Sequence, residues 1–433
     1  MLMLKIKNLN ELGTTPIRKT ALQIAEAGLL AIDTSSVIEK KVRVEGDSVV
    51  IDDIPFRPSP KSKIYLVGIG KCSSEASLAI EKILGDKLEG GIVLDVKESS
   101  EIGTRVKYYA GTHPFPSDKN VEVTKEIAEF LKQLGEDDFV IFIISGGGST
   151  LLCLPNEGNT CIEEEAILKQ LFSVGATIQE INTIRKHISL ARGGWLAKYA
   201  YPARSVALIF SDVPGNNLEF IASGPTVKDD TTVEDAGQIL AKYKILESCK
   251  LEGCGLIETP KEDKYFEKVI NVLAVSNILA LDAMKSEAEK FGFEAKILTD
   301  RIEGEAREVA NDIIKTLHDE PKRTVLLYGG ETTVTVDKKG RGGRNGELAL
   351  SALRFVEDGE LLMTVASDGR DNGPYAGAIV DLLSRQKAES LNLNIDEYLA
   401  GHNDAPFFEQ TGDYLMTGPT GSNVSDLLIA IKN

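Results

Sequence analysis

Two glycine-rich segments carry the residue types that hold phosphate groups in proteins. The segment Gly68-Ile69-Gly70-Lys71 follows an apolar run and precedes a helical pattern, so free backbone N–H groups would meet a lysine there. It matches neither the full dinucleotide fingerprint nor a Walker A loop, and a purely structural turn is the alternative. The second segment comprises Ser145, Gly146, Gly147, Gly148, Ser149 and Thr150. Three consecutive glycines gain nothing in packing, so they indicate close approach of a ligand such as a triphosphate, with a merely permissive loop as the alternative.

Acidic and amide side chains follow other apolar runs. Asp212 and Asp368 each come directly after a predicted strand, where a carboxylate suits a Mg²⁺ ligand or a base. Both are therefore predicted as catalytic and metal-binding residues. The alternative for Asp212 is an Asx-turn that caps its own backbone. Asn216, in the same loop as Asp212, and Glu331, which follows two glycines, are predicted to contact the nucleotide.

Basic residues stand out because the chain as a whole is acidic. Arg344 lies in a glycine loop before a predicted helix that Asn345 could cap, and its planar guanidinium suits bidentate pairing with phosphate or carboxylate. The segment 182–194 is also basic and includes Arg192, although a solvated helix face explains it equally well. The predicted substrate-binding residues are Gly70, Lys71, Arg192, Arg344 and Asn345, with Lys71 and Arg344 also predicted as catalytic.

Histidines and cysteines argue against other chemistries. The four histidines, His113, His187, His318 and His402, are too dispersed to predict a conventional zinc site. The five cysteines are scattered and form no C-x-x-C pair, which favours a reducing compartment.

The loops require an α/β scaffold, and the apolar pattern predicts one. Thr15-Pro16 begins a helix, and strands alternate with helices in both halves of the chain. The first half is expected to form a parallel, helix-covered sheet, with ligands bound beyond the carboxyl ends of its strands. Predicted strands lie within 63–70, 90–96, 105–111, 137–149, 205–215, 269–275, 294–300, 324–336 and 361–369, and helices in the second half within 277–291 and 304–317.

Length and charge bound the remaining possibilities. A chain of 433 residues is too long for one ordinary core, so we expect two domains, residues 1–255 and 256–433. A net charge of −17 argues against nucleic-acid and anionic-membrane partners. No apolar stretch reaches the ~18 residues of a membrane helix and no cleavage-site pattern follows the N-terminus, so a cytoplasmic protein is expected.

Taken together, the loops resemble the glycerate 2-kinase family, two-domain proteins with a C-terminal MOFRL domain, some of which were earlier named hydroxypyruvate reductases. The resemblance spans nearly the whole chain. The motifs that carry it are GIGK (68–71), GTHPFPS (111–117), SGGGST (145–150), INTIRKH (181–187), SDVPG with ASGPT (211–226), GGET (329–332), GGRN (342–345), ASDGRD (366–371) and TGPTGSNVSDL (417–427).

The resemblance implies ATP- and Mg²⁺-dependent phosphorylation of D-glycerate to 2-phosphoglycerate. It also implies an N-terminal Rossmann-like, three-layer parallel-sheet domain, a C-terminal α/β MOFRL domain and an active site in the interdomain cleft. Residue by residue, it implicates Lys71, Asp212, Arg344 and Asp368. The partners are then small molecules, D-glycerate and ATP, and a homodimer is left open.

The sequence departs from the family pattern at three places, and two other functions are also considered. Arg192 replaces a usual lysine, Gly346 a usual glutamine, and the segment with Asn372 and Tyr375 lacks an aspartate, which puts its metal role in doubt. One rival is an NAD(P)H-dependent hydroxypyruvate reductase that would use Gly68-x-Gly70 and Asp95, although the third glycine is missing. The other is a non-catalytic protein that binds sugar phosphates.

Overall fold

The computed structural model describes residues 4–97, 103–156, 159–213 and 215–433, which form two compact units. Residues 37–211 and 216–274 form one, the parallel-sheet unit. Residues up to 36, 212–215 and 275–433 form the other, the mixed-sheet unit.

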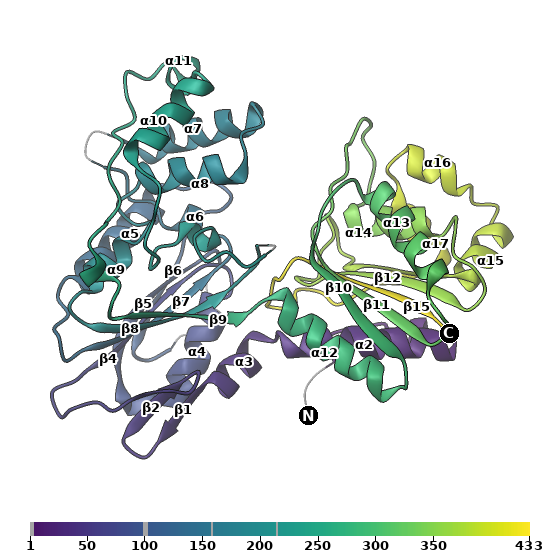
Figure 1. Ribbon diagram of the computed structural model, residues 1–433, viewed down its shortest axis with the longest axis horizontal. Helices are drawn as coiled ribbons and strands as arrows, with labels where there is room; N and C mark the ends of the chain where they lie inside the picture. Colours follow the sequence, from purple (N-terminus) through teal and green to yellow (C-terminus); the bar gives the residue numbers. More distant parts are fainter. Residues whose placement is uncertain (1–3, 98–102, 157–158, 214) are drawn as a thin grey trace. The chain divides into compact units, whose positions relative to one another are not determined.

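The parallel-sheet unit is built on a six-stranded sheet of order β6-β5-β4-β7-β8-β9 (Figure 1). The pairings from β6 to β8 are all parallel, as the apolar runs predict. Every residue of the central strand β7 is buried, which explains its unbroken apolar sequence. The strands are β4 (Ile64–Ile69), β5 (Leu88–Asp95), β6 (Val106–Ala110), β7 (Phe139–Ser145), β8 (Arg204–Phe210) and β9 (Val269–Val275).

Helices surround this sheet, and local signals set their starts. Thr160, Thr177 and Thr232 each cap a helix in a reciprocal capping box. The helices are α3 (Thr34–Lys41), α4 (Ser73–Leu84), α5 (Asp118–Leu131), α6 (Gly148–Leu151), α7 (Cys161–Ser173), α8 (Ile178–His187), α9 (Trp195–Ala200), α10 (Val233–Lys242) and α11 (Ile245–Cys249), with short 3₁₀ turns η1 (Gly85–Lys87), η2 (Ile221–Ser223) and η3 (Asp263–Tyr265). A small antiparallel sheet, which the sequence analysis did not predict, joins β1 (Val42–Glu45), β2 (Ser48–Ile51) and β3 (Ile54–Phe56).

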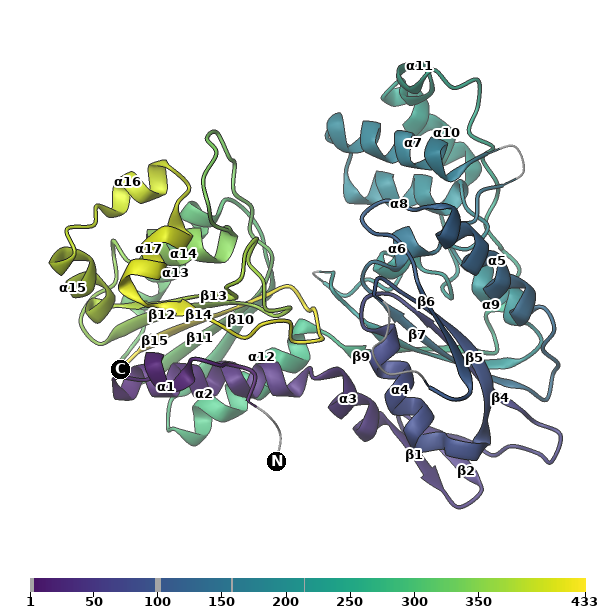
Figure 2. The ribbon, with the colours of Figure 1, turned by 180° about the vertical axis from the view of Figure 1, so that it is seen from behind.

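The mixed-sheet unit has a six-stranded sheet of order β10-β11-β15-β12-β13-β14. Only β10 and β11 are parallel; the other pairings are antiparallel. Helices α2 and α12 cover one face and α13 and α14 the other, as Figures 1 and 2 show. The bounds are α1 (Leu9–Leu12), α2 (Pro16–Ala31), α12 (Asn277–Lys290), β10 (Glu294–Ile302), α13 (Ala306–Asp319), β11 (Thr324–Gly330), α14 (Arg344–Ala352), β12 (Glu360–Ala366), β13 (Gly377–Asp381), α15 (Leu382–Ser390), α16 (Ile395–Ala400), α17 (Asp404–Thr411), β14 (Tyr414–Leu415) and β15 (Asp426–Lys432).

The compact units divide the chain differently from the predicted boundary at residue 255. Helix α2 starts where Thr15 and Pro16 predict, but it packs on α12 and belongs to the mixed-sheet unit. Strand β9 is the edge of the parallel-sheet unit's sheet, although it lies beyond residue 255. Helix α2 and strand β9 join these units through packing between residues far apart in the sequence, which local sequence patterns do not encode.

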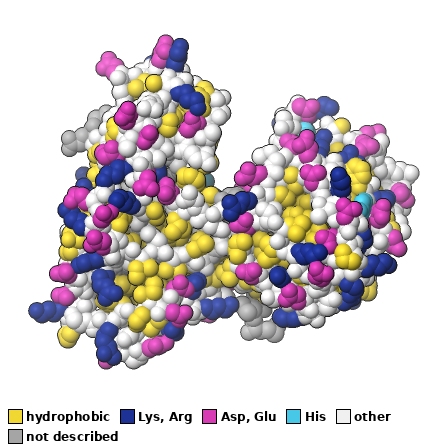
Figure 3. Space-filling view, viewed as in Figure 1, with side chains coloured by type: hydrophobic (Ala, Val, Ile, Leu, Met, Phe, Trp, Pro, Cys, Tyr) yellow, Lys and Arg dark blue, Asp and Glu magenta, His cyan; other side chains and the backbone are white. Residues whose placement is uncertain are grey.

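Charged side chains of both signs are interspersed over the face that Figure 3 shows. No single helix in the described part of the chain is long and apolar enough to cross a membrane. The pair α2 and α3, bent by 56°, passes that test together on length and composition alone.

Candidate functional site

The two predicted glycine loops lie against each other at the carboxyl ends of β4 and β7. Gly70 has a φ of +115°, and a Cβ atom there would lie 2.1 Å from Ser145 Oγ, so only glycine fits. The Lys71 N–H donates to the Gly146 carbonyl over 2.9 Å. A Cβ atom on Gly147 would lie 3.2 Å from Lys71 Cγ, so the lysine side chain passes directly over the glycine loop.

His113 lies beside Lys71, and Arg185 acts on His113 through its charge. A Cβ atom on Gly147 would also come within 3.4 Å of His113 Cδ2. Burial lowers the pKa of His113, and the nearby positive charges of Lys71 and Arg185 lower it further. Lys71 and His113 therefore lie against Gly147, and Arg185 lies within electrostatic range of His113. Sequence reasoning did not select His113 or Arg185, although both lie in motifs that carry the family resemblance.

Arg185 is a cation without an anionic partner in the described part of the chain. Burial, followed by the charge of Arg192, lowers its pKa to about 10, and the negative charge of Glu164 opposes this shift only in part. Its buried Nε atom has no hydrogen-bond partner among the described residues, and its guanidinium carbon lies 5.8 Å from the centre of the Phe172 ring. A partly buried charge with no ion pair of its own costs free energy, so the arrangement is what an anionic ligand would stabilise.

A strained turn at Ala222 and Ser223 packs against the glycine loop. Ala222 and Ser223 have φ values of 52° and 57°, which non-glycine residues seldom adopt. A Cβ atom on Gly148 would lie 2.5 Å from the Ala222 Cβ atom, so this turn packs closely against the loop. Ser223 Oγ lies 2.9 Å from Ser149 Oγ and donates to Asn182 Oδ1 over 2.9 Å. Three motifs that are distant in sequence thus meet here.

Other basic residues of the 182–194 segment are committed to internal partners. Lys186 is buried and lies 2.6 Å from Asp229. Arg192, predicted to bind substrate, is fully buried, and its Nη2 donates to Glu164 over 2.6 Å. Its guanidinium is therefore not presented to a ligand, and we do not include it in the site.

Arg344 also has internal partners. Its Nε and Nη2 bind both oxygens of Asp426, at 2.6 and 3.1 Å, and its Nη1 lies 2.8 Å from Glu331 Oε1. Burial alone would lower the pKa of Arg344, but the hydrogen bonds and charge of Asp426 raise it overall. Sequence reasoning missed Asp426, which lies in the TGPTGSNVSDL motif at the start of β15.

The predicted metal ligands lie in the same neighbourhood. The pKa of Glu331 is raised, first by burial and then by the negative charges of Asp426, Asp212 and Asp368. Arg344 opposes this shift only in part. Asp368 is exposed and accepts a hydrogen bond from the Arg370 N–H, and the Asp212 carbonyl accepts one from Ser425 Oγ. Local sequence places both aspartates after strands, and the fold brings them to one acidic cluster.

The remaining predicted residues have structural surroundings. Asn345 is 1% exposed, and helix α14 begins at Arg344 with Gly343 as its cap, so the predicted Asn345 cap is wrong. Asn216 has a φ of 55°, and Pro214 of the SDVPG motif lies outside the described residues. Asp95 is buried and accepts hydrogen bonds from the Ser74 and Val96 N–H groups, so its carboxylate is already used by the backbone and not by a ribose.

Two buried carboxyl groups, those of Asp371 and Asp404, contact the glycines around the start of α14. Asp371 accepts a hydrogen bond from the Gly346 N–H over 2.8 Å, and Asp404 packs against Gly342 and Gly346. Burial raises the pKa of Asp371 to about 6, and burial followed by the charge of Asp371 raises the pKa of Asp404. Both carboxyl groups therefore keep their protons to a higher pH than an exposed aspartate does.

This shift predicts a pH-dependent stability. Because the folded pKa of about 6 exceeds the ordinary 3.8, the folded protein keeps this proton where the unfolded chain has lost it. The resulting stabilisation is present below about pH 4 and disappears as the pH rises through 6. Asp371→Asn should therefore stabilise the protein at pH 7.5, by up to roughly 3 kcal/mol, and have little effect near pH 4. Urea unfolding at both pH values measures this, with the exposed Asp312→Asn as control; an equal effect at both would contradict it.

Comparisons with known proteins agree with this architecture. The DUF4147 family, described as a domain of unknown function, matches residues 20–252, and the MOFRL family matches residues 324–426. The chain is similar to a glycerate 2-kinase from Pyrococcus horikoshii, with 39% identity covering 96% of this chain and 97% of that protein. It is also 38% identical to a D-glycerate 2-kinase from Thermotoga maritima, covering 85% of this chain and 90% of that protein.

Solved structures extend the similarity to the whole fold. A crystal structure of a Pyrococcus horikoshii protein matches with a TM-score of 0.86 and 37% identity, covering 97% of this chain and 99% of that one. The crystal structure of a glycerate kinase from Thermotoga maritima matches with a TM-score of 0.85 and 33% identity, covering 96% and 99%. This chain, with its DUF4147 and MOFRL domains, therefore belongs to the glycerate 2-kinase family.

Proposed function

We propose that this chain transfers the γ-phosphoryl group of ATP to the C2 hydroxyl of D-glycerate. The observation that carries the proposal is that Lys71 and His113 lie against Gly147 of the glycine loop 145–150, with Arg185 close enough to His113 to lower its pKa. Phosphoryl transfer needs little covalent help from a protein, which must mainly align the two substrates and neutralise charge. The names of the Pyrococcus and Thermotoga relatives support the same reaction.

The glycine loop and its cations are assigned to anionic groups. The N–H groups of Gly147, Gly148 and Ser149 precede or open α6 and therefore have no helical acceptor, so they can donate to phosphate oxygens. Lys71 supplies a point charge, and Arg185 a planar fork, to the phosphates or to the glycerate carboxylate. Because the glycines carry no side chains, phosphate oxygens can approach the backbone N–H groups of this loop directly.

The acidic cluster of the mixed-sheet unit is assigned to Mg²⁺. Its carboxylates, Asp212, Asp368 and Glu331, offer the oxygen ligands that this ion prefers, and one or two suffice when phosphate oxygens supply others. The exposed position of Asp368 fits such a shared ligand set. When bound, Mg²⁺ would neutralise charge on the phosphate oxygens. Asp212 or Asp368 would also orient the attacking hydroxyl group.

The contacts revise the role predicted for Arg344. Because its guanidinium already binds Asp426 and Glu331, we assign it to holding these two carboxylates in place. Asn345 is assigned a similar positioning role, because it is buried beside Asp371.

The product identity tests the proposal. If Lys71 or Arg185 holds the glycerate carboxylate, the adjacent C2 oxygen lies at a short, fixed distance from that anchor, whereas the C3 hydroxyl rotates one bond further out. We expect 2-phosphoglycerate, so coupling to enolase and pyruvate kinase without a mutase should give a full signal. Adding phosphoglycerate mutase should leave the rate unchanged. A signal that requires the mutase would assign the transfer to C3, and no ATP consumption with glycerate would refute the kinase proposal itself.

A further inference from the structure

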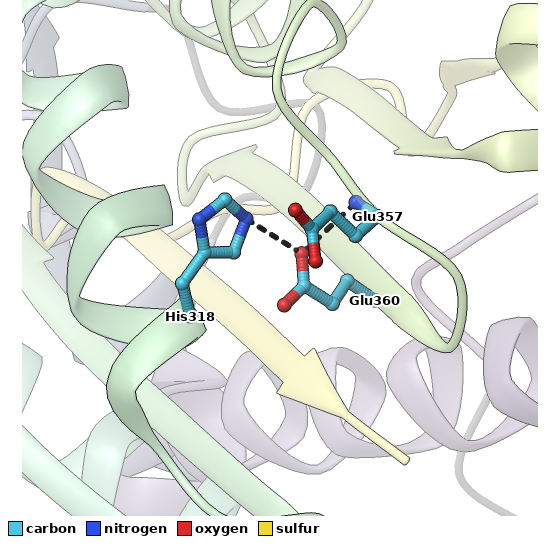
Figure 4. A group of neighbouring side chains, drawn as sticks. All are labelled: His318, Glu357 and Glu360. Carbon is cyan, nitrogen blue, oxygen red and sulfur yellow. Dashed lines mark hydrogen bonds and ion pairs between the residues drawn. The ribbon is translucent and has the colours of Figure 1, made fainter.

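A histidine and two glutamates gather at the end of the mixed-sheet unit's sheet that lies away from the acidic cluster. His318 lies near the end of α13, and Glu357 and Glu360 lie where the chain enters β12 (Figure 4). One ligand atom from each lies within 4.8 Å of the other two, and no other group of three such residues in the described ranges meets this limit. Glu360 begins β12 and Asp368 follows its end, so the strand separates this triad from the residues assigned to catalysis.

The potential ligand atoms lie close together. Glu360 Oε2 accepts a hydrogen bond from the Glu357 N–H over 3.0 Å and lies 3.1 Å from His318 Nε2, as Figure 4 shows. The Glu360 side chain is 1% exposed, and its Oε1 has no hydrogen-bond partner among the described residues. The buried His318 Nε2 also lacks one, although it lies 3.1 Å from Glu360 Oε2. Lys432 Nζ forms an ion pair with Glu360 Oε1 at 3.8 Å, and its hydrogen bonds go to the Leu317 and His318 carbonyls. Unsatisfied buried polar atoms of this kind indicate a missing ligand.

A second histidine of the same unit shows the contrast. His402 also lies between two carboxylates, Glu347 and Asp337, but each of its ring nitrogens makes a hydrogen bond of 3.0 Å. That arrangement is complete without a ligand, whereas the His318 arrangement is not.

We propose that His318, Glu357 and Glu360 bind a divalent transition-metal ion, with Zn²⁺ the best match. One imidazole and two carboxylates form a typical nitrogen and oxygen donor set for Zn²⁺, and water completes the tetrahedron. Binding requires the ligand atoms to move closer together, which the exposed Glu357 permits. The ion would join the end of α13 to the start of β12 and would stabilise this unit. Three ligands from two distant segments explain why a search for histidine clusters in the sequence does not find this site.

Zn²⁺ titration of chelator-treated protein tests the proposal directly. We expect a saturable calorimetric step of about one ion per chain and a rise in the melting temperature with Zn²⁺. Glu357→Gln, at an exposed position, and His318→Gln should each weaken that step by at least about tenfold. Asp337→Asn, which removes the exposed partner of His402, is the matched control and should leave it unchanged.

Cobalt substitution provides a second readout. Co²⁺ should give visible absorption bands of a low-coordinate nitrogen and oxygen site, and these should disappear in His318→Gln. Absence of a step that depends on His318, by calorimetry and by Co²⁺ absorption, would overturn the proposal. The result is independent of kinase activity, because none of the three residues is assigned to the reaction.

Discussion

Lys71→Met is expected to lower kcat by about a hundredfold or more while the protein remains folded. Lys71 is exposed at the turn after β4, and its side chain lies over Gly147 in the loop assigned to the phosphates. A preorganised positive charge at this point stabilises negative charge in the transition state, and losing one such group typically costs a factor of a hundred to a thousand. Steady-state kinetics with ATP and glycerate measure the loss.

The control for this variant is Lys125→Met, an exposed lysine on α5 in the same unit. It removes the same charge from the protein surface and should leave kcat unchanged. Both variants should unfold at the wild-type denaturant concentration, because neither residue is buried. A kcat for Lys71→Met within a few-fold of wild type would remove Lys71 from the catalytic residues.

Arg185→Met is expected to make the enzyme more stable and much less active. The partly buried guanidinium has no anionic partner in the described part of the chain, and burial lowers its pKa to about 10. A neutral side chain of similar length removes this cost, so the free energy of unfolding should rise by roughly 1 to 3 kcal/mol. The same change should lower kcat/KM by about a hundredfold if Arg185 binds a substrate anion.

Arg192→Met is expected to change the free energy of unfolding in the opposite direction, by lowering it. Arg192 is paired with the buried Glu164, so its loss leaves an uncompensated carboxylate and should cost roughly 3 to 5 kcal/mol of stability. Denaturant unfolding and steady-state kinetics of the two variants therefore separate a ligand-binding cation from a structural one. Loss of stability in Arg185→Met, with unchanged kinetics, would show that Arg185 also has a structural role only.

Internal ion pairs limit the number of cations that the proposed anion site can use. The charges of Lys186, Arg192 and Arg344 are each matched by an internal carboxylate. Lys71 and Arg185 are the cations that the described structure leaves for a ligand there. Their small number makes each of them important, which is why the two largest effects are expected at these positions.

The amino-acid sequence by itself determined the α/β class, the glycine loops after β4 and β7, the capping of α2 by Thr15 and the family of the chain. These features depend on local chemistry: alternation of apolar residues, turn residues and caps act within a few positions. The sequence also placed Asp212 and Asp368 correctly after strands, because both follow unbroken apolar runs. Local signals of this kind can be read from the sequence alone, because they do not depend on tertiary contacts.

Only the tertiary structure decided which charged side chains remain available to a ligand. Arg344 is matched by Asp426, which is 82 residues away in sequence, and Arg192 by Glu164, 28 residues away. In the described part of the chain Arg185 forms no such ion pair, and the charge of Glu164 acts on it only in part. Three arginines that look alike in the sequence therefore differ in how their charges are paired. The physical reason is that burial and pairing set the free energy of a charge, and both are created by residues that only the folded chain brings together.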